Sequence, residues 1–179
     1  INPSHQEIIV NVFMEGAMDV FFEEDLREEL VDEMMGLIKS VPLVPESFIS
    51  KLVEKLLVAF SGSLRDALRE SFSEYREAAF QGRQLPVLPA MATSLAERDR
   101  LVAHYEDKPF LLQLRRIFVD RILEDCFATG LKSVLPIRGC AVWVVGHFVD
   151  ATFDALEGIE KIEHSVQLFQ IRNGPPTAE

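Results

Sequence analysis

Apolar residues recur every three or four positions along most of the chain, which is the spacing of one face of an α-helix. The first stripe runs from Ile9 through Phe13 to Val20. The next stripe starts at Leu26 and is rotated against the first by about 60° at 100° per residue, which predicts two helices, with a single bent helix as the alternative. No segment shows convincing period-two alternation, so the sequence predicts an all-α fold. The expected helices span about residues 5–22, 26–40, 46–60, 63–82, 94–106, 110–128 and 136–171, and the last could break at Gly158.

Local signals mark several helix ends. Ser4-His-Gln-Glu7 and Ser94-Leu-Ala-Glu97 are capping boxes, in which the Ser hydroxyl accepts a hydrogen bond from the amide three residues on. Pro109 suits a first helical turn, because an amide N–H at that position would have no helical partner. Ser61-Gly-Ser63 predicts a break between two helices.

Residues 136–154, P-I-R-G-C-A-V-W-V-V-G-H-F-V-D-A-T-F-D, contain the longest nearly uncharged apolar run. Such a run is typical of a helix that is buried on several sides. Seven helices with short connections fit an irregular HEAT-like stack of helix pairs or, alternatively, a closed helical bundle. We expect residues 1–172 to form a single helical domain or solenoid fragment, with the longest loop over 84–92 and a disordered tail over 173–179.

One face of the helix expected there carries His147, Asp150 and Asp154 at positions i, i+3 and i+7. Nitrogen and oxygen donors at that spacing could hold a metal ion. The face lies opposite the apolar stripe through Phe148, however, so we interpret it as the solvated side and expect no metal site. Trp143 lies on the same polar face. It either tucks under a neighbouring loop or packs against a further helical layer, and we count it among the candidate partner-binding residues.

Arg115 shares the apolar side of the helix expected over 110–128. We expect its stem to lie along the helix with the guanidinium in water, and a salt bridge between helical layers is the alternative. Cys126 follows Glu124 and Asp125, whose negative charges disfavour the thiolate that a nucleophile needs. No acid–base pair, nucleophile or phosphate loop can be assembled from the remaining residues. The sequence therefore predicts no enzymatic activity, no catalytic residues and no cofactor.

The chain has 29 acidic and 18 basic residues, a net charge of −11. Because nucleic acids and anionic membranes require Lys and Arg to neutralise phosphate, this balance disfavours both and leaves other proteins as the expected partners. No uncharged stretch reaches the roughly 20 residues of a membrane span, and only two Cys indicate a reduced, cytoplasmic protein. Part of the negative charge is concentrated in one cluster, either a solvated turn or a docking patch for a basic partner: Glu23, Glu24, Asp25, Glu28 and Glu29.

Ala141-Val-Trp-Val-Val-Gly-His-Phe-Val, with Thr152-Phe153-Asp154 after it, resembles the V-W-x-x-G-[EH]-[YF] element of the adaptins. These are large subunits of adaptor-type vesicle-coat complexes, and the resemblance is nearest to the zeta-type subunit of the fifth adaptor complex. In that family the element opens a helix of a HEAT-like α-solenoid. The resemblance implies a subunit fragment of a trafficking coat, associated with membranes through its complex.

Taken with the all-α pattern, this leads us to expect a non-enzymatic protein-interaction scaffold. The alternative is a closed helical bundle that binds a small apolar ligand as a regulatory domain. A fragment cut from a longer solenoid would expose apolar residues that its neighbours once covered. We expect such exposure at both ends, at Ile8, Ile9, Val12, Leu168, Phe169 and Ile171.

Overall fold

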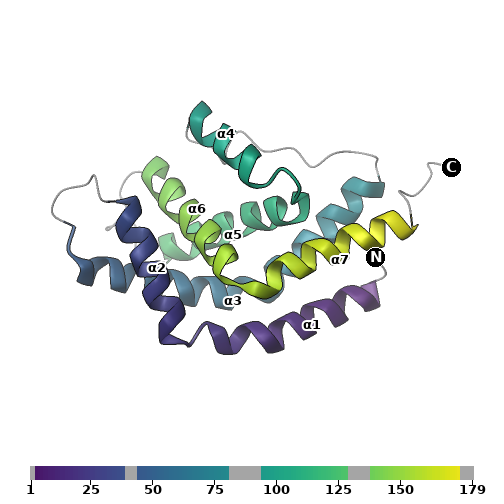
Figure 1. The fold of residues 1–179 in the computed structure, drawn as a ribbon, viewed down its shortest axis with the longest axis horizontal. Helices are drawn as coiled ribbons and strands as arrows, with labels where there is room; N and C mark the ends of the chain where they lie inside the picture. The colour runs from purple at the N-terminus through teal and green to yellow at the C-terminus, as the bar shows by residue number, and fades with distance from the viewer. Residues whose placement is uncertain (1–2, 39–43, 81–93, 129–137, 174–179) are drawn as a thin grey trace.

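The fold is seen in a computed structural model, which describes residues 3–38, 44–80, 94–128 and 138–173 (Figure 1). Within these ranges the chain forms seven helices and no strand, so the all-α prediction is confirmed. The helices are α1 (Pro3–Val20), α2 (Glu24–Leu37), α3 (Glu46–Phe80), α4 (Leu95–His104), α5 (Pro109–Ala128), α6 (Arg138–Ala155) and α7 (Glu157–Asn173).

The long helix α3 is continuous, although Ser61-Gly-Ser63 predicted a break in it. Phe60 and Leu64 lie on either side of Gly62 and are fully buried, so the apolar face runs through this triplet without interruption. A helical Gly costs about 1 kcal/mol relative to Ala, whereas burying one large apolar side chain contributes about 1.5–3 kcal/mol. The predicted break is therefore wrong, because packing outweighs the local propensity.

The helix predicted over 136–171 is in fact two helices, α6 and α7, which are separated at Leu156. Leu156 is buried, so the turn keeps an apolar side chain in the core. Gly158, where a break was considered, lies just after the turn and faces α1. A Cβ on Gly158 would lie 3.0 Å from the ring of Phe13. Because that side chain is absent, α1 can approach α7 closely.

The predicted helix starts are right in some places and wrong in others. The amide of Glu97 donates to Ser94 Oγ over 3.1 Å, which confirms the cap of α4. α5 begins at Pro109, also as predicted. By contrast, α1 already includes Pro3, so the helix begins before Ser4 and not after it, and the Ser4 side chain lies outside the described residues.

All helices except α4 form a closed ring of four long elements, and Figure 1 shows α4 above them. Two elements are the single helices α3 and α5. The other two are pairs joined at a turn, α1 with α2 and α6 with α7, and the separation of α1 from α2 is the one that the phase change predicted. α3 packs against α5, α1 and α2, and α5 also packs against α6 and α7.

Contacts of α1 with α7 and of α2 with α6 close this ring. In an open stack of helix pairs, each repeat contacts only its neighbours, so the first and last helices lie apart. Of the two arrangements that the sequence allowed, the contacts favour the closed bundle.

Phe60 of α3 is the centre of an aromatic core. Its ring stacks on Phe118 of α5, with 4.1 Å between the ring centroids. Phe21, in the turn after α1, lies 5.5 Å from Phe60 by the same measure, and Phe148 and Phe153 of α6 lie 6.3 Å and 6.1 Å away. Phe148 is fully buried, as predicted. All four long elements therefore meet at one cluster of rings.

Two of the expected features fall outside the described residues, namely the loop over 84–92 and the tail from residue 174 onward. Asn173, which the sequence placed in the tail, is instead the last residue of α7. Across the described ranges, no helix is long and apolar enough to cross a membrane.

Candidate functional site

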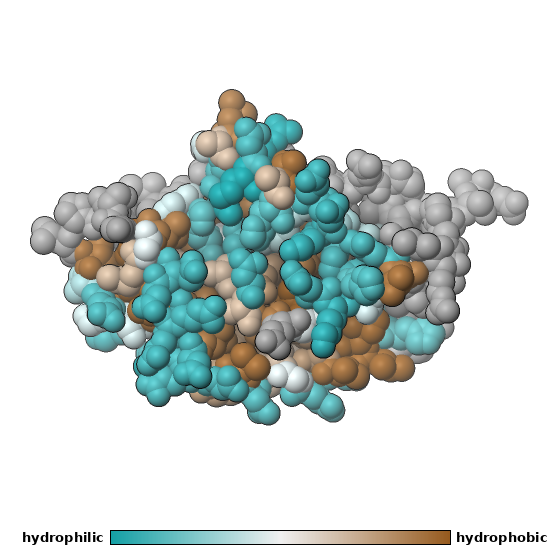
Figure 2. All heavy atoms as spheres, viewed as in Figure 1, coloured by the Kyte–Doolittle hydropathy of each residue, from teal (hydrophilic) through white to brown (hydrophobic). Residues whose placement is uncertain are grey.

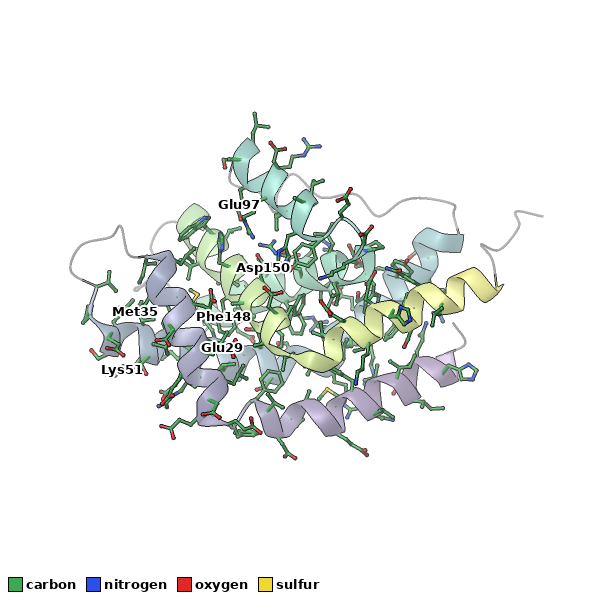
Figure 3. The ribbon with its side chains drawn as sticks, in the orientation of Figure 1. Glu29, Met35, Lys51, Glu97, Phe148 and Asp150 are labelled. Atoms are coloured by element: carbon green, nitrogen blue, oxygen red, sulfur yellow. The ribbon has the colours of Figure 1, made fainter. Side chains whose placement is uncertain are left out.

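Charged and polar side chains from α4, α5 and α6 meet at the carboxylate of Asp150 (Figure 3). Arg115 of α5 donates to it twice, with 2.7 Å from Nε to Oδ1 and 3.3 Å from Nη2 to Oδ2. Arg100 of α4 donates to Oδ2 over 3.0 Å, and the Tyr105 hydroxyl, at the end of α4, donates to Oδ1. The side chains of Arg115 and Asp150 are only 2% and 7% exposed. We call Arg100, Tyr105, Arg115 and Asp150 the Asp150 cluster.

Gly146 makes room for the guanidinium of this cluster. It lies one helical turn before Asp150, on the same side of α6. A Cβ on Gly146 would lie 2.5 Å from Arg115 Nη2, which is shorter than any normal contact. α6 thus leaves space at one turn and provides a carboxylate at the next. The sequence did contain a signal for the Arg115–Asp150 pair. On α6 a Gly is followed by Asp at i+4, and on α5 a lone Arg lies on an apolar face.

The face of α6 that we expected to be solvated is covered in its middle. Asp154 is exposed, His147 is half-buried and Asp150 is buried. The prediction for Asp150 is wrong because α4 and Arg115 lie over this face, and the periodicity of a helix does not report what packs on its polar side. The guanidinium of Arg115 does not reach water either. The alternative, a salt bridge between helical layers, is confirmed.

Glu97 and His147 extend the cluster toward solvent. Glu97 accepts two hydrogen bonds from Arg100, at 3.1 Å from Nε and 2.5 Å from Nη2. His147 Nε2 lies 3.4 Å from a Glu97 oxygen but without hydrogen-bond geometry, and this buried nitrogen has no hydrogen-bond partner. The ring of Trp143 lies 4.7 Å from the His147 ring by centroids. Trp143 is half-buried and packs against the core.

Burial and neighbouring charges together shift the pKa values of the titratable groups at this site. Burial alone raises the pKa of Asp150, but the Arg115 charge and the hydrogen bonds from Arg115 and Tyr105 outweigh it, so the pKa lies below its usual value. Burial and the Asp150 charge raise the pKa of Tyr105 well above its usual value. Burial, helped by the Arg100 charge, lowers the pKa of His147. At neutral pH the cluster and its neighbour therefore comprise a carboxylate, a neutral phenol and a neutral imidazole.

The Asp150 carboxylate accepts four hydrogen bonds, about as many as its two oxygens can hold. The lone pairs of this carboxylate are therefore already used by donors within the protein. Among the described residues, no group of three or more His, Cys, Asp or Glu is placed to hold a metal ion. The Cys126 side chain lies outside the described residues. The hydrogen bonds of the Asp150 cluster hold α4 against α5 and α6.

The predicted acidic residues lie elsewhere in the molecule, in the turn between α1 and α2 and in the first turns of α2. In Figure 1 this turn is at the lower edge, and α6 begins at the upper left. The ring contact that the structure shows for Trp143 is with His147 of α6. All five of them are exposed: Glu23, Glu24, Asp25, Glu28 and Glu29.

An apolar groove of about 690 Å³ lies between α1 and α7, at the surface of the bundle. Ile8 and Val12 line its α1 side and are 58% and 65% exposed. Phe13 and Gly158, which are in contact, also line it. Gly16 lines the same groove, and no atom lies within 4 Å of the position that its Cβ would take. Figure 2 shows hydrophobic side chains gathered at the lower right, along α1.

This groove contains part of the terminal apolar surface that the sequence predicted. Ile8 and Val12 are exposed as expected, and so is Leu168 near the end of α7. Ile9 is partly buried against the core instead. The side chains of residues 169 and 171 lie outside the described part of the chain.

No protein-family model matches this chain, and no curated protein or solved structure does either. The resemblance of Ala141–Asp154 to the adaptins therefore stays a prediction. Within this chain, three residues of that stretch have a local physical role. Gly146 and Asp150 receive Arg115, and Phe148 fills the core.

Proposed function

We propose that this protein is a protein-interaction module whose α1–α7 groove binds an amphipathic helix of a partner protein. The observation that carries the proposal is the double-sided apolar surface of α1. One side of α1 packs into the core through Val10 and Met14, while Ile8 and Val12 face the groove and solvent. Apolar side chains that are exposed together along a groove typically mark an interface.

The length of the groove suits a helix. Its α1 wall extends from Ile8 to Val20, which at 1.5 Å per residue is about 18 Å, or about three helical turns. Its other wall is formed by α7, together with the turn at Leu156. A helix that lies between two flanking helices can insert one apolar stripe into the groove, with anchors at i, i+3, i+4 and i+7.

The charges beside the groove indicate a basic partner. α1 contains no Lys or Arg, and Glu15 and Asp19 are exposed on it. Glu23 lines the end of the groove, whereas α7 contributes Lys161. A partner helix with Lys or Arg on the flank that faces α1 would complement this distribution, and its approach would be favoured by the net charge of −11.

This role is consistent with the scaffold function expected from the sequence. The adaptin-like stretch suggests one setting for this role, a subunit of a vesicle-coat complex in the cytoplasm. That setting rests on the resemblance alone. The alternative function, binding of a small apolar ligand, requires a site that encloses most of the ligand. The exposure of Ile8 and Val12 favours a longer occupant that covers the groove from outside.

Gly16→Leu tests the proposal, because Gly16 lines the groove and no atom lies within 4 Å of the position that its Cβ would take. The probe is a fluorescein-labelled amphipathic peptide of about 16 residues, helical over about 24 Å, with a Leu stripe and Lys on one flank. We expect fluorescence anisotropy to show binding to the wild type, weakened about tenfold or more in Gly16→Leu, which corresponds to about 1.4 kcal/mol.

Gly62→Leu is the matched control, since Gly62 is also helical and open but lies on α3 outside the groove. Both variants should melt no lower than the wild type, because Leu is a better helix former than Gly. A peptide of the same composition without the apolar stripe should not bind. Equal affinity of the two variants for the helical peptide, or no binding to the wild type, would overturn the proposal. Binding of an apolar dye without binding of the peptide would support the small-ligand alternative.

A further inference from the structure

The turn between α1 and α2 presents a second apolar surface, away from the α1–α7 contact. Phe22 is 81% exposed, more than any other large apolar side chain of the described residues, and Val58 of α3 is 72% exposed. Both side chains line a hollow of about 460 Å³. Phe21 and Leu57, which line it too, are buried, so the hollow is continuous with the core.

The remaining lining of this hollow is mostly acidic. Glu23, Glu24 and Glu54 contribute carboxylates, and Arg27 is the one cation among its lining residues. Arg27 forms an ion pair with Glu54, with 2.5 Å from Nη1 to Oε1, so these two charges offset each other and Glu23 and Glu24 remain. Asp25, Glu28 and Glu29 are exposed on the adjoining turns of α2 and add to the negative field. The hollow therefore combines an apolar opening with a negative rim.

From this combination we infer that the hollow at Phe22 and Val58 is a second docking site, which binds a short basic segment of a partner protein. An apolar anchor side chain of the segment lies between Phe22 and Val58, and Lys or Arg residues beside the anchor face Glu23 and Glu24. An exposed aromatic side chain beside a hollow is the kind of residue that contributes most to binding at protein interfaces. The inference goes beyond the groove between α1 and α7, with which the hollow shares only Glu23 among the lining residues.

Charge argues against a second copy of this chain as the occupant. An isologous contact through this turn would bring the two acidic rims together, and each copy has a net charge of −11. A basic segment, by contrast, would be attracted to the acidic rim. Because the flanking carboxylates are exposed, its binding should weaken with salt, as the Debye length falls from about 10 Å at 0.1 M to about 3 Å at 1 M.

The test uses the whole chain and a fluorescein-labelled peptide, Lys-Lys-Leu-Phe-Arg-Lys, in anisotropy titrations at low and high salt. We expect the wild type to bind this peptide, and Phe22→Ser and Val58→Ser each to weaken binding about tenfold. Glu24→Lys should weaken binding at low salt and reduce its salt dependence. Neither a peptide with Ser in place of Leu-Phe nor a peptide with Glu in place of the basic residues should bind comparably.

Leu95→Ser is the matched control, because Leu95 is also exposed but lies on α4, and it should leave the affinity unchanged. Gly16→Leu should leave it unchanged too, which separates this site from the α1–α7 groove. The inference fails if Phe22→Ser binds the peptide as the wild type does, or if the Ser-substituted basic peptide binds equally well. Sedimentation equilibrium that shows a dimer abolished by Phe22→Ser would also overturn it, in favour of a second copy.

Discussion

The guanidinium of Arg115 occupies the space where Gly146 lacks a side chain, so that a Cβ at Gly146 would lie 2.5 Å from Nη2. One turn further along α6, Asp150 receives the same guanidinium through two hydrogen bonds. The Arg115 side chain thus joins α5 to α6, because its guanidinium fits the space at Gly146 and binds Asp150. Because the ion pair is almost fully buried, loss of either partner has consequences that loss of an exposed ion pair does not have.

Gly146→Ala should destabilise the protein by about 1–3 kcal/mol, although Ala is intrinsically about 1 kcal/mol better than Gly in a helix. The new methyl group would push the Arg115 guanidinium away from Asp150. Gly62→Ala is the control, because nothing lies within 4 Å of its added Cβ, and it should stabilise by up to about 1 kcal/mol. Urea unfolding measures both. A stabilised Gly146→Ala variant would contradict the close approach of Arg115.

Asp150→Ala should cost about 3–5 kcal/mol of unfolding free energy, because it leaves the Arg115 charge buried without a counter-charge. Combining it with Arg115→Met removes that charge, so the double variant should be less destabilised than the sum of the two single variants. Chemical denaturation of the four proteins in this cycle gives the coupling. A cost below about 1 kcal/mol for Asp150→Ala would mean that Arg115 reaches water in solution, as its sequence pattern suggested.

Phe148→Ala should destabilise by about 3–5 kcal/mol, the usual cost of emptying a core aromatic site. Phe148 is fully buried and its ring packs edge-on to Phe60. Phe22→Ala changes the same residue type at an exposed position and should alter stability by no more than about 0.5 kcal/mol. Thermal and urea unfolding compare the two. Similar losses in both variants would show that the assigned core is wrong.

The contribution of His147 to stability should decrease as the pH falls from about 7 to about 5, the range in which His titrates. Burial and Arg100 lower the folded-state pKa of His147 below its ordinary 6.5, so the fold favours the neutral ring. The resulting stability is fully present above the unfolded-state pKa and is lost as the pH falls through the lower folded-state pKa. The lowered pKa of Asp150 acts in the same direction, but only below its ordinary 3.8.

His147→Gln should flatten this decrease, because Gln does not titrate. The nearby charges on the other helices remain constant in this range. The pKa of Arg100 is raised, so this residue stays protonated, and the pKa of Glu97 is lowered from 4.5, chiefly by its hydrogen bond with Arg100. Unfolding free energies at several pH values, measured for both proteins, provide the comparison. An unchanged slope in His147→Gln would assign the pH dependence to other groups.

Much of the secondary structure was readable from the sequence, because helix formation depends on neighbours a few positions apart. The phase change across Glu23-Glu24-Asp25 located the break between α1 and α2, and Ser94 and Pro109 marked the starts of α4 and α5. The core position of Phe148 followed from its place in one apolar stripe. Each of these signals is contained within about two helical turns.

Only the tertiary structure decided what covers the polar side of α6 and how the helices close into a ring. Asp150 looked solvated from its own helix and is buried by Arg100 and Arg115, which lie 50 and 35 positions away in the chain. The α1–α7 groove joins helices from opposite ends of the chain. A helix specifies which of its faces is apolar, but the energy of a buried charge or a shared groove depends on partners that only folding brings close.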